Sequence, residues 1–164
     1  MPDVDSVVSA PDETAASAAR SGRPWVVPAG WIEAPDPRPM RLATYTVPAL
    51  AGPVEVAVSR FAGRVGGDLA NVNRWRGQMG LPPIGADELD ERIVRFSAPG
   101  YDGYQTRIEA PTGVMLAAGV YDASIDQMWF VRATVGESDE ADRIQADLFG
   151  MARSIAGLDN EGDD

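Results

Sequence analysis

The chain of 164 residues contains no cysteine, no histidine and no lysine, so all 14 of its basic residues are arginines. Without histidine or cysteine it lacks the ligands of the usual zinc, copper, haem and iron–sulfur sites. The same absences exclude Ser–His and Cys–His nucleophiles, Schiff-base chemistry and a phosphate-loop lysine. Because only carboxylate, hydroxyl and guanidinium chemistry remains, we expect a non-catalytic protein with no cofactor and no metal site.

Long apolar runs are also missing, and none approaches the roughly 20 residues of a membrane-spanning helix, so we expect no direct membrane insertion. The opening "MPDVDSVVSA" has neither a basic start nor an apolar stretch and does not predict a signal peptide. A net charge of −11 argues against nucleic acid as a partner, because the phosphate backbone would be repelled.

The composition divides the chain into three parts. Residues 1–24 mix Ala, Ser, Asp and Pro without an apolar period, which predicts a disordered leader or tether. Residues 159–164 form an acidic tail. We therefore expect one folded domain over residues 25–158, long enough to bury a core.

Apolar alternation predicts two strands near the start of this domain and four more in close succession: 40–47, 54–61, 92–98, 103–110, 113–122 and 127–135. Short links between the last four predict antiparallel neighbours. Helical spacing predicts helices over 68–80 and from Ser138, as N-cap, to Gly157, with "GADELDER" as a short acidic connection. Adjacent Trp129 and Phe130 point to opposite faces of one strand, which indicates that both faces are covered. The fold class is thus α+β, a single domain with an antiparallel sheet of about six strands flanked by helices.

The block "GGDLANVNRWRGQMGLPP", residues 66–83, gathers unusual polar residues on the first predicted helix. At about 100° per residue, one set of apolar residues falls on a single face of the helix, which we expect to pack against the core. A second set of residues is expected on the solvent side. The apolar set is Leu69, Val72, Trp75 and Met79; the solvent set is Asn71, Arg74 and Gln78. Arg76 falls inside the apolar arc, with Asn73 at its border.

Two interpretations of Arg76 follow. A buried guanidinium needs partners. Arg76 therefore either reaches the edge of the helix or bonds strand-end carbonyls or an acidic side chain, or it points into a cleft and holds a carboxylate or phosphate. Asn73 and Tyr104 would share that cleft. Arg64 belongs to a locally basic segment over residues 60–76, and Trp31, Arg74 and Gln78 are expected to include exposed partner contacts. The candidate binding residues are therefore Arg76, Asn73, Arg74, Gln78, Trp31 and Arg64.

The N-x-N-R-W-R-G-Q block, preceded by "MRLATYTV" and a second strand ending "VSRF", resembles an uncharacterised bacterial protein family over about residues 25–157. Members of that family are often exported lipoproteins with a lipidated cysteine before a low-complexity tether, so the resemblance implies a lipid anchor; the present sequence has the tether-like leader and no cysteine. The element order is similar to the PsbP-like fold, an α/β/α sandwich whose members mainly bind protein partners. This second resemblance implies a fold and no particular function.

Taken together, these features predict a non-catalytic binding or accessory module that docks on a larger extracytoplasmic or membrane-associated complex through a protein partner. A periplasmic or other extracytoplasmic location is favoured, with a cytoplasmic one left open. The alternative is a small anionic-ligand binder, or a carboxylate-dependent enzyme, that uses a cleft near Arg76.

Overall fold

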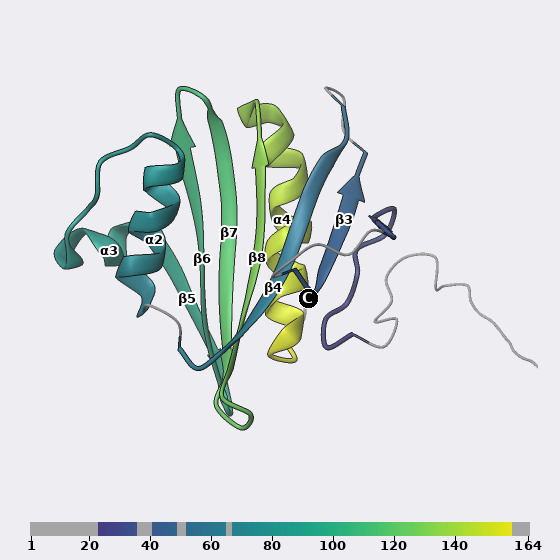
Figure 1. Ribbon diagram of the computed structural model, residues 1–164, viewed down its shortest axis with the longest axis vertical. Helices are drawn as coiled ribbons and strands as arrows, with labels where there is room; N and C mark the ends of the chain where they lie inside the picture. Colours follow the sequence, from purple (N-terminus) through teal and green to yellow (C-terminus); the bar gives the residue numbers. More distant parts are fainter. Residues whose placement is uncertain (1–22, 36–40, 49–51, 65–66, 159–164) are drawn as a thin grey trace, which may run out of the picture.

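Alternating apolar residues build one seven-stranded antiparallel sheet in the computed structural model, which describes residues 23–35, 41–48, 52–64 and 67–158 (Figure 1). The strands are β2 (Ile32–Glu33), β3 (Ala43–Val47), β4 (Val54–Ala62), β5 (Ile93–Ala98), β6 (Tyr101–Ala110), β7 (Gly113–Asp122) and β8 (Gln127–Val135). Their order across the sheet is β2-β3-β4-β8-β7-β6-β5, and every neighbouring pair is antiparallel.

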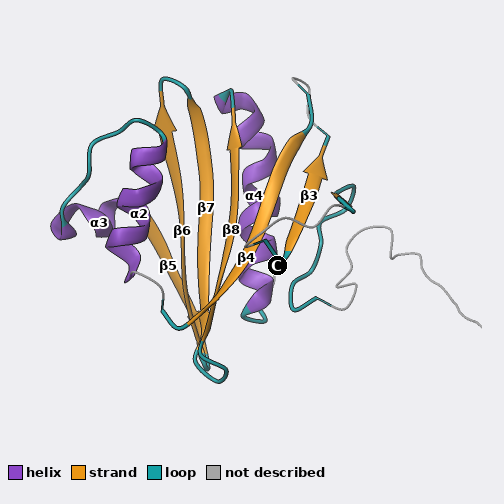
Figure 2. Ribbon diagram, viewed as in Figure 1, coloured by secondary structure: helices purple, strands orange, loops and turns teal. Residues whose placement is uncertain are grey.

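The order of the strands across the sheet determines which face each helix covers. Strands β5 to β8 pair consecutively through short turns, as predicted, but β4 pairs with β8 in the middle of the sheet. The chain must then travel from β4 to β5 at the far edge, and it carries α2 (Gly67–Gln78) and α3 (Ala86–Arg92) along that path. Helix α4 (Ser138–Ile155) follows β8 and covers the other face, so the sheet lies between helices (Figure 2).

Each face of the sheet buries its own apolar cluster. On the α4 side the cluster joins that helix to alternate residues of the central strands, among them Val56, Val58, Leu116, Val131 and Trp129. On the α2 side Val72, Trp75 and Met79 pack on the opposite set, which includes Ile108, Met115, Met128 and Phe130. The α+β architecture is therefore confirmed, and Trp129 and Phe130 do point to opposite faces.

Two local expectations were wrong. The segment "GADELDER" contains helix α3, because Leu89 is buried against the α2-side cluster and gives this acidic stretch an apolar anchor. Ser138 is the first residue of α4, and Glu137 is the N-cap without a capping side-chain bond. The described part of the chain also adds a short edge strand, β2, to the expected six. The predicted leader (apart from residues 23–24) and the acidic tail lie outside the described residues.

Candidate functional site

Two unusual polar residues of α2 fasten the loop that follows it. The Asn73 side chain accepts a hydrogen bond from the Ile84 N–H at 2.8 Å and donates one to the Ile84 carbonyl at 3.0 Å. Arg76 Nε donates to the Pro82 carbonyl at 2.8 Å, and Arg76 is only 9% exposed. Arg76 therefore bonds the protein's own backbone, in line with the first of the two interpretations, but its acceptor is a carbonyl of the loop after α2 and not of a strand end.

The turn at the end of α2 requires a glycine of the block. Gly80 has a φ of +77°, a conformation that favours glycine. The Leu81 N–H donates to the Arg76 carbonyl at 2.8 Å, which satisfies an acceptor at the helix end, as in a Schellman motif. Because the chain turns here, the loop runs back beside α2, within reach of Asn73 and Arg76.

Asn71 is fully buried, so its expected place on the solvent side was wrong. Its Nδ2 donates to the Tyr104 hydroxyl of β6 at 3.1 Å, and its Oδ1 accepts from Arg74 Nη1 at 2.9 Å. Strand β6 thus approaches this flank of the helix, which a helical wheel alone does not show. Burial raises the pKa of Tyr104 to about 12, although the Asn71 bond acts in the opposite direction.

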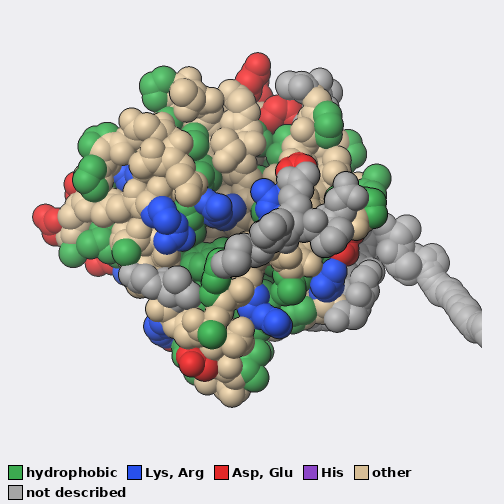
Figure 3. All heavy atoms as spheres, in the orientation of Figure 1, with side chains coloured by type: hydrophobic (Ala, Val, Ile, Leu, Met, Phe, Trp, Pro, Cys, Tyr) green, Lys and Arg blue, Asp and Glu red, His purple; other side chains and the backbone are tan. Residues whose placement is uncertain are grey.

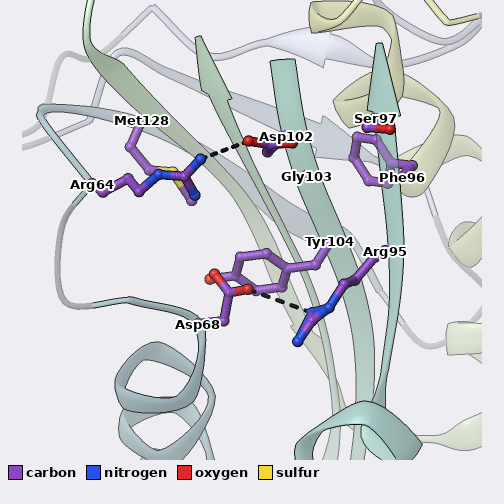
Figure 4. A pocket seen from close by; sticks show the side chains of 9 residues that line it. All are labelled: Arg64, Asp68, Arg95, Phe96, Ser97, Asp102, Gly103, Tyr104 and Met128. Atoms are coloured by element: carbon purple, nitrogen blue, oxygen red, sulfur yellow. Dashed lines mark hydrogen bonds and ion pairs between the residues drawn. The ribbon is translucent and has the colours of Figure 1, made fainter. Parts of the chain in front are cut away.

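A pocket of about 360 Å³, here called the α2 pocket, opens at the N-terminal end of α2 beside strands β5 and β6 (Figure 4). It combines apolar surface with two arginines and two aspartates. Its lining residues are Arg64, Asp68, Arg95, Phe96, Ser97, Asp102, Gly103, Tyr104 and Met128. Figure 4 shows the Arg64–Asp102 and Asp68–Arg95 pairs on either side of the Tyr104 ring.

The charged residues of the pocket form exposed ion pairs. Arg64 Nη2 lies 2.7 Å from Asp102 Oδ2, and Arg95 Nη1 lies 3.6 Å from Asp68 Oδ2. Arg95 also pairs with Asp90 at 2.9 Å, and the Arg64 guanidinium stacks 4.3 Å from the centre of the Tyr121 ring. Exposed pairs of this kind stabilise a fold by only about 0–1 kcal/mol. A ligand can therefore exchange with one member of a pair at small cost.

Of the residues singled out from the sequence, Arg64 and Tyr104 line the α2 pocket. Trp31 is partly buried and packs against Tyr45, with ring centres 6.4 Å apart. Arg74 and Gln78 are exposed on one flank of α2. Arg76 and Asn73 hold the loop after α2, and this geometry gives no support to a cleft at Arg76. The binding roles of these residues stay predictions.

Sequence reasoning missed Arg95 and Asp102 because it treated their segments only as strands. The register pairs Arg95 with Tyr104 and Ser97 with Asp102, so alternate residues of two strands share the face that α2 covers. The Pro-Gly turn between β5 and β6 fixes that register. Pairing the strands outward from this turn would have brought the same side chains together.

The described residues contain no group of three or more His, Cys, Asp or Glu side chains placed to hold a metal ion. Within the same part of the chain, no helix is long and apolar enough to cross a membrane.

No protein-family model matches this chain, and neither does any curated protein. Among solved structures it is similar to LpqN, a protein involved in cell envelope biogenesis of Mycobacterium tuberculosis. The two share 15% sequence identity over 87% of each chain, with a TM-score of 0.43. Similarity this weak carries no argument about fold or function.

Proposed function

We propose that this chain is a non-catalytic binding module that receives a segment of a partner protein in the α2 pocket. One observation carries the proposal: an apolar floor of Tyr104 and Met128 lies beneath exchangeable ion pairs at the rim. Protein interfaces have this anatomy, with a desolvated centre and a polar rim, and tyrosine and arginine are enriched among the residues that dominate binding.

In this proposal, a carboxylate of the partner replaces Asp102 in the Arg64–Asp102 ion pair. The Asp102 side chain is 65% exposed and that of Arg64 49%, so the carboxylate is the member that leaves most readily. Arg64 is meanwhile held in place by its contact with the Tyr121 ring. A partner carboxylate that replaces Asp102 would meet a positioned guanidinium, which favours binding because little freedom is lost. The expected partner segment therefore presents an acidic side chain next to an apolar one.

The tyrosine of the pocket is poorly suited to acid–base catalysis near neutral pH. Burial raises the pKa of Tyr104 to about 12, so this side chain holds its proton. General acids and bases work best when their pKa lies near the operating pH. This supports a binding role over an enzymatic one.

We further propose that the module is an accessory of a larger assembly outside the cytoplasm. The support is the N-x-N-R-W-R-G-Q block, which resembles a family whose members are often exported; no family model matches the chain, so this resemblance stays a prediction. Fractionation of the native host tests this part separately: recovery with the envelope fraction supports it, and recovery only with cytoplasmic proteins contradicts it.

Site-specific photo-crosslinking in the native host tests the docking site. A photoreactive phenylalanine analogue at Ser97, which lines the pocket and is exposed, is expected to cross-link one discrete protein. The matched control places the same analogue at Arg143, an exposed position on α4 at the opposite face of the sheet. A cross-linked protein at position 97 and none at 143 supports the proposal. The same products at both positions, or none at 97, contradict it.

A further inference from the structure

A second charged feature lies in the corner between α2 and β8, apart from the α2 pocket. Arg132 of β8 pairs in register with Ala57 on one side and Ala117 on the other, so both of its direct neighbours across the sheet are alanines. Across the corner, Arg132 Nη1 donates to Gln78 Oε1 of α2 at 2.9 Å. Figure 3 shows basic side chains gathered in the middle of this face of the molecule.

Two guanidiniums share one aromatic ring in this corner. The Cζ atom of Arg132 lies 5.8 Å from the centre of the Trp75 ring, and that of Arg74 lies 6.0 Å from it. Trp75 itself is completely buried, so the ring is a fixed support between helix and sheet. The two charges lie near enough to interact, since the charge of Arg74 contributes to the lowered pKa of Arg132, and Arg74 remains exposed.

Neither arginine has a carboxylate partner among the described residues, whereas Arg64, Arg95 and Arg107 all form ion pairs. Burial lowers the pKa of Arg132, and the nearby charges of Arg74 and Arg41 lower it further. Arg41 lies 3.5 Å from Glu55, so the uncompensated charge of the corner is carried by Arg74 and Arg132. In a chain of net charge −11, this pair is an unusual concentration of positive charge.

We propose that the corner of Arg74, Gln78 and Arg132 binds a phosphate group. Two guanidiniums balance the two negative charges of a phosphomonoester, and the planar fork of arginine matches the spacing of phosphate oxygens. The Gln78 carboxamide uses its oxygen on Arg132 and keeps its N–H donors for the ligand. The ligand is either a soluble phosphomonoester or a lipid headgroup of the same chemistry.

The test is binding of phosphate probes to the full-length chain by calorimetry. One arm uses glycerol 3-phosphate; the other uses phosphatidylcholine vesicles with and without phosphatidic acid. We expect a dissociation constant of about 1 mM or tighter for at least one probe. Binding in the first arm identifies a soluble ligand, and binding only to phosphatidic acid identifies a lipid headgroup. Absence of binding in both arms overturns the proposal.

Variants then locate the bound phosphate. Arg74→Gln and Arg132→Gln are each expected to weaken binding at least about tenfold, because each removes a charge-assisted contact. Arg143→Gln makes the same charge change on the other face and is expected to have no effect. Equal losses in all three variants would show a non-specific charge effect and overturn the assignment.

Side-chain NMR of the wild-type chain keeps the test independent of variant folding. Saturating probe should shift the Nε–H resonances of Arg74 and Arg132 and the indole N–H of Trp75, and leave that of Arg143 in place. A probe that shifts Arg143 and not Arg132 contradicts the proposal.

Discussion

Replacing Asn73 by alanine is expected to detach the loop after α2 and to lower the free energy of unfolding by about 2 to 4 kcal/mol. The amide makes two hydrogen bonds to the backbone of Ile84, at 2.8 and 3.0 Å, and Ile84 is 8% exposed. Each bond contributes roughly 0.5–1.5 kcal/mol, and a buried backbone group left without a partner costs about 1–3 kcal/mol. Two backbone groups of Ile84 lose their partner, for a cost of about 2–6 kcal/mol, and we take the lower part of this range because the detached loop can admit some water.

Urea unfolding, followed by tryptophan fluorescence and circular dichroism, measures this change. Glu91→Ala on the neighbouring helix α3 is the control, since Glu91 is exposed, and its effect should stay within about 1 kcal/mol. If Asn73→Ala is no more destabilising than Glu91→Ala, the side-chain amide does not hold the loop and the structural account of the block is wrong.

Three further outcomes are expected. Tyr104 should ionise near pH 12 in an ultraviolet titration. Because folding favours its neutral form, its contribution to the free energy of unfolding is complete below pH 10 and is lost as the pH rises through about 12. Tyr104→Phe should remove this pH dependence. Gly103→Ala should lower the free energy of unfolding by about 2 kcal/mol or more, because the added Cβ meets the Phe96 ring and lies 3.0 Å from the Gly119 carbonyl. The control Gly136→Ala adds a Cβ that meets nothing within 4 Å, so thermal unfolding should show it to be nearly neutral. Arg107→Gln removes the 2.7 Å pair that joins β6 to Asp142 of α4, and should lower stability by about 1 kcal/mol, with a smaller effect at high salt; an effect that grows with salt would contradict the ion-pair explanation.

The strands were predictable because their apolar residues alternate. Val54, Val56 and Val58 place one face of β4 in the core, and β7 and β8 match their predicted bounds, 113–122 and 127–135. Two features of the sheet depend on contacts that are distant in sequence. The pairing of β4 with β8 joins residues about seventy positions apart. Helix α3 forms around Leu89, which is buried against the α2-side cluster of residues from other parts of the chain.

The candidate site was predictable only in part. Helical geometry marked Arg76 as out of place, and the structure gives it a backbone carbonyl as partner. The same geometry put Asn71 on the solvent side, because a helical wheel contains no strand β6 and no Tyr104. The α2 pocket combines residues from a loop, a helix and three strands, so no local pattern in the sequence marks it.

The central claim is that the α2 pocket holds a partner segment through Arg64. The affinity of the full-length chain for the protein cross-linked through position 97 tests it most directly, with Arg64→Gln compared against Arg143→Gln. The account predicts at least about tenfold weaker binding for Arg64→Gln, as expected for loss of a charge-assisted contact, and unchanged binding for Arg143→Gln. Equal affinities for the wild type and Arg64→Gln would contradict it.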